Sequence, residues 1–315
     1  MNTHLIQTID LKKYFKTNTG QLHAVDGINL SIPQGETLGV VGESGCGKST
    51  LGRVILRLLD ATDGQVLYQG NDILLYNKEQ MQQLRQELQI IFQDPYSSLN
   101  PRMNVSELIA EPMRVNKIFP NKAKMNARIL ELMDTVGLAR RLEDAYPHEL
   151  DGGRRQRIGI ARALAVNPKF IVCDEPVSAL DVSIQAQILN LLMDLQDEMG
   201  LTYMFITHDL SVVRHISNKI VVMYLGQCVE LCSSGELFRT PLHPYTRALL
   251  SAIQQPNLEN RKEKREIIRG EVTSPIDPKP GCRFYDRCNH AKEACKEPLQ
   301  LKEVSENHSV ACVLY

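Results

Sequence analysis

The sequence predicts an α/β fold in which a mostly parallel sheet is covered by helices, followed by a small cysteine-rich extension. Three observations predict this fold. Short apolar runs alternate with segments of helical periodicity, as in strands joined by crossover helices. A glycine-rich loop at residues 42–49 joins one apolar run to one helical segment. Four of the eight cysteines lie beyond residue 281.

The order of the elements follows from these patterns. The first 41 residues alternate apolar runs with turns, such as the one at 33–36, and are expected to be rich in β-strands. Compact apolar runs farther along predict buried strands. Helical spacing predicts helices over 51–59, within 105–142 and over about 183–199. The expected strands are 5–9, 28–32, 37–41, 65–69, 88–92, 170–173, 203–206 and 220–223.

Composition limits the class of protein. The 315 residues are 43% hydrophobic and 23% charged, which is ordinary for a globular chain and long enough for about two domains. The 36 basic and 37 acidic residues give a net charge of −1, which argues against a nucleic-acid partner. No signal peptide and no run of about 18 apolar residues is apparent. We expect a cytosolic chain that reaches a membrane only through a partner.

Residues 42–49 match the G-x-x-x-x-G-K-S pattern of a phosphate-binding loop. The apolar run before the loop and the helix after it place backbone N–H groups and a helix N-terminus around one spot, which favours a phosphate. Lys48 is expected to reach the β- and γ-phosphates of a nucleotide, and Ser49 to bind Mg²⁺. The candidate nucleotide-binding residues here are Gly42, Glu43, Ser44, Gly45, Cys46, Gly47, Lys48, Ser49 and Thr50.

Two carboxylates follow the apolar run 170–173. Asp174, at the expected strand end, is placed to hold Mg²⁺ directly or through water. Glu175 is placed beyond it to orient and deprotonate an attacking water. Asp181 follows six residues later, and His208 comes just past the strand at 203–206, where a side chain can touch a γ-phosphate. Together with the loop, these residues predict a nucleoside triphosphatase.

With these motifs the chain resembles the ATP-binding subunits of ABC transporters over about residues 5–253. Gln93 is similar to the family's glutamine that contacts the metal and couples the subunits, and Phe15 to the aromatic residue that stacks on adenine. The resemblance implies a P-loop NTPase cassette, with a RecA-like mixed-sheet core, an antiparallel β subdomain and a helical subdomain at about 94–165. It also implies a dimer in which two ATP molecules are each held between one subunit's phosphate loop and the other's signature.

That signature reads L-S-G-G-Q in the family, whereas this chain has Leu-Asp-Gly-Gly-Arg at 150–154. Asp151 replaces the serine and Arg154 the glutamine. Aspartate caps a helix about as well as serine, but its charge is expected to repel a γ-phosphate by about 4 kcal/mol at 4 Å and a dielectric near 20. Arg154 is placed to offset this by pairing with Asp151 or reaching the phosphate. Asp151, Gly152, Gly153, Arg154 and Asp181 complete the candidate nucleotide contacts.

Residues 93–102 and 243–250 narrow the resemblance to the dipeptide and oligopeptide importer branch, which also contains importers of nickel and other metal chelates. The resemblance implies a motor subunit on the cytoplasmic face of the membrane that hydrolyses ATP. Its implied partners are a second, paralogous ATP-binding subunit, two transmembrane permease subunits and, indirectly, an extracytoplasmic substrate-binding protein. Other interpretations are an importer of metal chelates or opines, a catalytically weak regulatory subunit of an asymmetric pair, and a soluble ATPase acting on ribosomes or DNA.

Residues 254–315 are expected to form a separate extension, with a charge run at 261–266 and prolines that stiffen the approach to the cysteines. The cysteine spacings of five, six and sixteen residues are wider than the pairs that zinc usually prefers. The resemblance implies a [4Fe–4S] cluster; zinc, with His308 as a ligand, and free or disulfide-bonded thiols are the alternatives. The candidate cluster ligands are Cys282, Cys288, Cys295 and Cys312.

Overall fold

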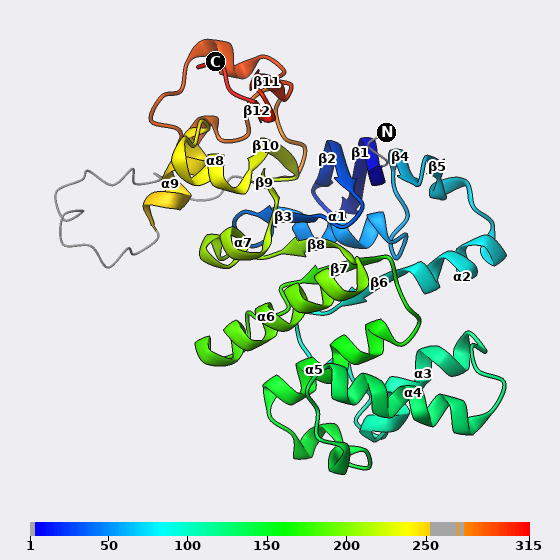
Figure 1. The fold of residues 1–315 in the computed structure, drawn as a ribbon. Coiled ribbons are helices and arrows are strands. Elements are labelled where there is room, and N and C mark those ends of the chain that lie inside the picture. Colours follow the sequence, from blue (N-terminus) through cyan, green and yellow to red (C-terminus); the bar gives the residue numbers. More distant parts are fainter. Residues whose placement is uncertain (1–3, 253–269, 271–273) are drawn as a thin grey trace, which may run out of the picture. The chain divides into compact units, whose positions relative to one another are not determined.

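The computed structural model describes residues 4–252, 270 and 274–315. The chain divides into two compact units (Figure 1). The first unit is built mainly from Leu75–Ile206. The second contains Ile6–Ile32, Thr37–Leu74 and the described residues from Thr207 onward.

The first unit contains three parallel strands. β7 (Phe170–Asp174) lies between β6 (Leu88–Ile91) and β8 (Thr202–Ile206). Every residue of β7 and β8 is buried, as expected for parallel strands covered on both faces. The long helix α6 (Val182–Met199) connects β7 to β8, and α2 (Lys78–Glu87) precedes β6.

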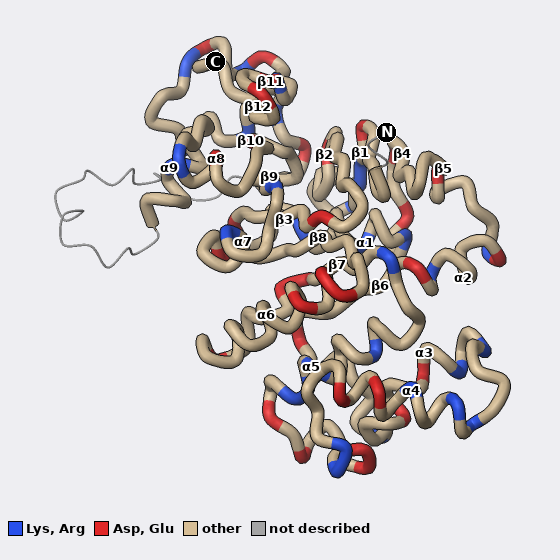
Figure 2. The backbone as a smooth tube through the Cα atoms, viewed as in Figure 1, with Lys and Arg blue, Asp and Glu red and all other residues tan. Residues whose placement is uncertain are grey.

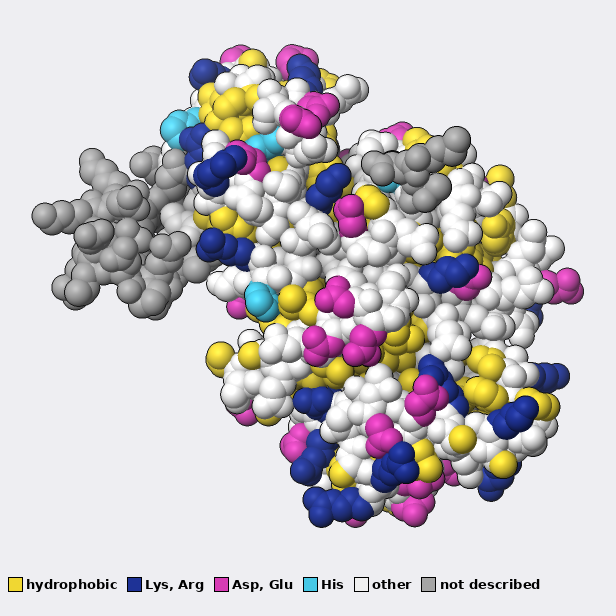
Figure 3. Space-filling view, in the orientation of Figure 1, with side chains coloured by type: hydrophobic (Ala, Val, Ile, Leu, Met, Phe, Trp, Pro, Cys, Tyr) yellow, Lys and Arg dark blue, Asp and Glu magenta, His cyan; other side chains and the backbone are white. Residues whose placement is uncertain are grey.

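The rest of the first unit is helical. It consists of α3 (Val105–Val115), α4 (Lys122–Thr135) and α5 (Gly152–Leu164), which pack together through buried apolar side chains (Figure 1). Asn104 and Glu107 form a capping box at the start of α3, which satisfies two otherwise unpaired N–H groups. Basic and acidic side chains alternate over these helices (Figures 2 and 3), with no single-sign surface on the face that is seen.

The second unit holds the other described strands, apart from the first two residues of β1 and the last residue of β2. β3 (Thr37–Val41) runs parallel to β9 (Lys219–Tyr224), and β10 (Gln227–Ser233), β12 (His308–Val310) and β11 (Lys302–Ser305) extend this sheet in antiparallel pairs. A second sheet has the order β2-β1-β4-β5. Its strands are β2 (Gly20–Pro33), β1 (His4–Thr17), β4 (Asp63–Tyr68) and β5 (Asn71–Asp72). The helices of this unit are α1 (Lys48–Ile55), α7 (Leu210–Ile216), α8 (Ser234–Arg239) and α9 (Pro244–Ser251).

Every strand expected from apolar runs is present, although β1 and β2 are longer than expected because their outer parts are polar. The expected helix 51–59 is wrong in its bounds. It begins at Lys48 and ends at Ile55, since Arg57 takes a left-handed conformation with φ of 50°. The expected helical segment 105–142 contains two α-helices, α3 and α4. The charge run 261–266 lies outside the described residues. Among the helices that are described, none is long and apolar enough to cross a membrane.

Candidate nucleotide-binding site

The glycine-rich loop connects β3 to α1, and two of its glycines are required by the surrounding backbone. A Cβ on Gly42 would lie 2.2 Å from the carbonyl oxygen of Met223, and a Cβ on Gly47 would lie 2.0 Å from that of Ala24. Gly47 also takes a left-handed φ of 103° as the residue before α1, where it supplies no capping side chain. The first N–H groups of α1 are therefore not satisfied by a side-chain cap, which suits a phosphate.

The amine of Lys48 is folded back over this loop. Its side chain is buried, and Nζ donates hydrogen bonds to the carbonyl oxygens of Gly42 at 2.8 Å and Glu43 at 3.0 Å. The Cys46 thiol lies 3.9 Å from the same Nζ, and burial raises its pKa, so it remains a protonated thiol packed inside the loop. The loop thus places a buried positive charge at the N-terminus of α1.

Glu43 is also held by two residues that the sequence did not single out. Its carboxylate accepts two hydrogen bonds from the guanidinium of Arg287, at 2.7 and 3.1 Å. Its backbone N–H donates to the hydroxyl of Tyr245 at 2.8 Å. Arg287 is 244 positions away in sequence and belongs to the cysteine-rich tail, so no local pattern predicts the contact.

In the first unit, the two candidate carboxylates stand at the end of β7. Asp174 is its last residue and is 2% exposed. Glu175 follows with a φ of 49°, and its N–H donates to the carbonyl of Ile206 at 3.0 Å. The Nε2 of Gln93 donates to the Glu175 carboxylate at 2.9 Å. The fold therefore joins Gln93 to Glu175 across 82 sequence positions.

The altered signature begins α5. Asp151 is the N-cap, and its carboxylate accepts the N–H of Arg154 at 2.8 Å, as expected for an aspartate in this position. The second carboxylate oxygen lies 3.5 Å from Nε of Arg154, and the two side chains are 60% and 48% exposed. A Cβ on Gly153 would lie 2.8 Å from the Cγ2 of Ile184, so only glycine lets α5 approach α6 so closely.

The remaining candidates lie at element ends or on the second sheet. Asp181 precedes α6 but makes no side-chain capping bond. His208 is exposed, between β8 and α7. Phe15 is partly buried, with the amine of Lys13 4.9 Å from its ring centroid. Phe15, His208 and the glycine-rich loop belong to the second unit, whereas Gln93, Asp174, Glu175, Asp181 and the signature belong to the first.

The four tail cysteines are close to one another. Burial, together with the neighbouring thiols of Cys295, Cys288 and Cys312, raises the pKa of Cys282 to about 12. The Sγ of Cys288 accepts the N–H of His290, and that of Cys295 accepts the N–H of Lys292, each at 3.4 Å. All eight cysteines lie in the described residues, and none of them forms a disulfide bond.

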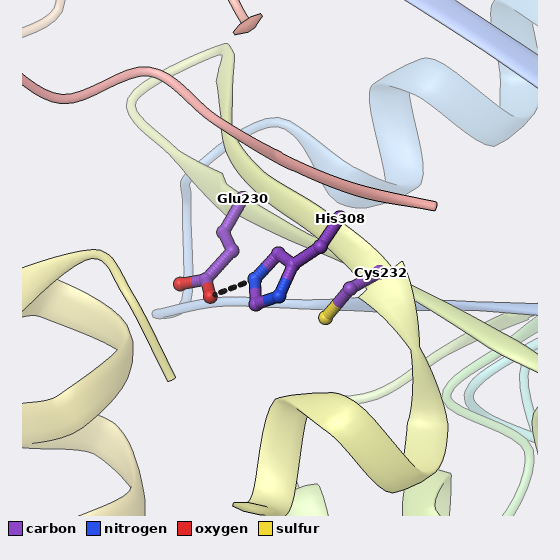
Figure 4. A group of neighbouring side chains, drawn as sticks. All are labelled: Glu230, Cys232 and His308. Carbon is purple, nitrogen blue, oxygen red and sulfur yellow. Dashed lines mark hydrogen bonds and ion pairs between the residues drawn. The ribbon is translucent and has the colours of Figure 1, made fainter. Parts of the chain in front are cut away.

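His308 is not a neighbour of these four thiols in the way that a shared zinc ion requires. Its Nε2 lies 2.8 Å from a carboxylate oxygen of Glu230, beside Cys232, and all three side chains are buried (Figure 4). Glu230 also accepts the N–H groups of Leu242 and His243, so it ties β12 to the segment before α9. Thiolates on one zinc ion, at 2.3 Å each, lie within about 4.6 Å of one another. Among the described residues, no group of three tail cysteines, with or without His308, has this spacing. Zinc bound with His308 therefore stays a prediction that this geometry does not support.

Comparison with known proteins agrees with this geometry. Residues 25–178 match the ABC transporter family, and residues 229–295 match the family described as oligopeptide/dipeptide transporter, C-terminal region. A dimeric structure of the ATP-binding cassette MJ0796 bound to ADP and Pi superposes with a TM-score of 0.67 at 28% identity, covering 73% of this chain and 98% of that one. The cbiO1 subunit of Clostridium perfringens gives 0.67 at 28% identity, covering 76% and 92%.

Curated relatives match over nearly their whole length. The oligopeptide transport ATP-binding protein OppF of Salmonella typhimurium is 50% identical, covering 98% of this chain and 96% of the relative. AppF of Bacillus subtilis, also an oligopeptide transport ATP-binding protein, is 48% identical, covering 99% and 97%. The dipeptide transport ATP-binding protein DppF of Haemophilus influenzae is 46% identical, covering 99% and 97%.

The fold and the glycine-rich loop thus define an ATP-hydrolysing cassette of the ABC transporter class. Within that class, the chain belongs to the family of oligopeptide and dipeptide transport ATP-binding proteins. Both the predicted family and the predicted ATPase activity are confirmed.

Proposed function

We propose that this chain is the motor subunit of an oligopeptide or dipeptide importer, and that ATP binds at the loop between β3 and α1. The observation that carries the proposal is the full-length similarity to peptide-transport ATP-binding proteins, in a chain whose loop holds a buried lysine at a helix N-terminus. Lys48 binds the β- and γ-phosphates, the loop N–H groups surround them, and Phe15 stacks on the adenine ring.

The hydrolytic step is assigned to Glu175, Gln93 and His208. Glu175 orients the attacking water and accepts its proton, and Gln93 holds the carboxylate in place through its hydrogen bond. His208 contacts the γ-phosphate, and Asp181 lies at the nucleotide contact between subunits. Mg²⁺ fits the donor set of Ser49, Gln93 and Asp174, because all three offer oxygen atoms, which this cation prefers; when bound it neutralises charge on the phosphates.

We further propose that the cassette spans residues 1–253, with a helical subdomain at about 94–165, and that 254–315 form an extension. The subunit pairs with a paralogous ATP-binding subunit and with two permease subunits at the cytoplasmic face of the membrane, and an extracytoplasmic binding protein delivers the peptide. The altered signature favours a second possibility, a pair with two unequal ATP sites. The site that uses Asp151 and Arg154 is then the weaker one.

The tail cysteines are proposed to hold a [4Fe–4S] cluster. The other three thiols contribute to the raised pKa of Cys282, and the sulfurs of Cys288 and Cys295 accept backbone N–H groups, as sulfurs around such clusters do. Protein purified without oxygen is expected to absorb broadly near 400 nm and contain about four irons per chain, and Cys288→Ser to lose both. Colourless protein with stoichiometric zinc would refute the cluster.

The nucleotide assignment is tested at Lys48. The Lys48→Ala variant removes the point charge on the phosphates, worth about 4 kcal/mol at 4 Å and a dielectric near 20, so affinity for ATP is expected to fall by about three orders of magnitude. Titration of a fluorescent ATP analogue measures this, with Lys16→Ala as the control outside the loop. Affinity within a few-fold of the wild type would refute the assignment.

A further inference from the structure

We propose that Arg287 of the cysteine-rich tail is a positioning residue for the phosphate loop, acting through Glu43. This inference rests on the proposed ATP site, since it concerns the same loop. The tail thereby acts on nucleotide affinity without contacting the nucleotide.

The contact is partly buried and bidentate. Arg287 is 8% exposed, and its guanidinium meets both carboxylate oxygens of Glu43, at 2.7 and 3.1 Å. The planar guanidinium fixes the orientation of a carboxylate as well as its position, which an ammonium group does not. Glu43 is 27% exposed, so solvent screens this pair only in part.

Arg287 is itself held firmly within the tail and the sheet. It donates to the hydroxyl of Tyr224 at 3.2 Å, and the Glu43 contact raises its pKa further. Phe284, three residues earlier, packs edge-on against Tyr224 and at a tilt against Tyr245, with ring centroids 5.3 and 5.4 Å away. Tyr245 in turn accepts the backbone N–H of Glu43. Tyr245 and Arg287 therefore contact Glu43 directly, and Tyr224 and Phe284 pack against these two residues.

Glu43 is the residue through which this support reaches the phosphate-binding groups. Its carbonyl oxygen accepts the Lys48 amine at 3.0 Å and the N–H of Cys46 at 3.3 Å. A displacement of Glu43 therefore moves the lysine that binds the phosphates. The positive charge of Arg287 has a second effect. It offsets the negative charge of the Glu43 carboxylate, which would otherwise repel an anion bound at the loop.

The alternative is that Arg287 only stabilises the fold. Removing first the Arg287 charge and then the Glu43 charge distinguishes this structural role from a positioning role. Arg287→Gln leaves the Glu43 carboxylate unpaired beside the loop, so we expect about tenfold weaker ATP binding. Adding Glu43→Gln removes that carboxylate and is expected to recover most of the loss. A purely structural arginine predicts no recovery, because the second substitution removes a further native contact.

The measurement is the dissociation constant of a fluorescent ATP analogue for the full-length protein, with the melting temperature recorded for each variant. Arg247→Gln is the matched control, since Arg247 joins α9 to the tail residue Tyr315 and to the carbonyl of Pro241, away from the loop. It is expected to leave ATP affinity unchanged. The ATP site itself is established if the wild type binds ATP and the Lys48→Ala variant does not. A failure of the proposed site can therefore be distinguished from a failure of this inference.

The inference is overturned if folded Arg287→Gln binds ATP as tightly as wild type, if Glu43→Gln brings no recovery, or if Arg247→Gln loses as much affinity. Should Arg287→Gln not fold, Arg287→Lys takes its place. It keeps the charge but gives up one of the two parallel hydrogen bonds, so affinity is expected to fall a few-fold. Unchanged affinity in that variant overturns the inference as well.

Discussion

The charged signature at the start of α5 leads to a prediction about charge compensation. Asp151 caps the helix, and its second oxygen lies 3.5 Å from Arg154. In the isolated subunit this pair is about half exposed, so it is worth about 1 kcal/mol or less. In a closed dimer, where a γ-phosphate displaces water, an uncompensated Asp151 repels the phosphate by up to about 4 kcal/mol at 4 Å and a dielectric near 20.

Arg154→Gln removes the positive charge that compensates Asp151 and leaves the Asp151 carboxylate in place. We expect ATP turnover of the complete transporter to fall by about fivefold to tenfold, which corresponds to about 1 kcal/mol in the barrier. The double variant Asp151→Ser, Arg154→Gln removes both charges and is expected to turn over ATP faster than wild type. The folding stability of the double variant is expected to stay close to that of the wild type, because serine also caps the helix. Asp151→Ala, by contrast, is expected to lose about 1 kcal/mol of folding free energy.

Steady-state phosphate release by the reconstituted transporter measures turnover, and denaturant unfolding of the free subunit measures stability. Arg140→Gln is the control, because Arg140 forms a comparable exposed pair with Asp134 in the same helical region but outside the signature. The reasoning is wrong if Arg154→Gln is as active as the double variant, or if the control loses as much turnover.

Two further predictions concern catalysis and pH. Glu175→Gln keeps the side chain's size and its contact with Gln93 but removes the proton acceptor. It is therefore expected to remove most of the ATP turnover of the complete transporter, while ATP still binds. Retention of most activity would contradict the role of Glu175 as base. His243 is 1% exposed, and burial, helped by the nearby Arg247 charge, lowers its pKa to about 4, below the value near 6.5 in an unfolded chain. The unfolded state therefore binds the proton first as pH falls, and the fold loses up to about 3 kcal/mol between pH 6.5 and 4 from this residue. His243→Asn keeps a cap for α9 without titrating, so the stability difference between variant and wild type, measured by urea unfolding, should change over this pH range; a constant difference would refute the assignment.

The buried strands were predictable because their apolar runs are continuous. β3 was predicted with its observed bounds, and β7 was one residue longer than predicted, since Asp174 still pairs with Ile206. Helix ends were harder to predict. The apolar pattern continues to Leu59, but the helix ends at Ile55 and Arg57 takes a left-handed conformation, which apolar periodicity does not encode.

The phosphate loop was predictable because eight consecutive residues carry its whole pattern. The pairing of Gln93 with Glu175 could not come from spacing, and only the family resemblance suggested that the two act together. Neither the sequence spacing nor the family resemblance indicated the contact of Arg287 with Glu43. An arginine between two cysteines resembles any solvated charge in a sequence, and only the folded tail brings it to the loop.

Glu175 shows that this chain tolerates local strain at the place where a carboxylate must be aimed. A φ of 49° is a conformation that glycine or asparagine adopts readily, whereas a glutamate held there costs about 1 kcal/mol. This left-handed residue follows directly after Asp174, the last residue of β7. Substitutions selected only for stability would therefore be expected to favour glycine at 175 and to abolish hydrolysis while improving the fold.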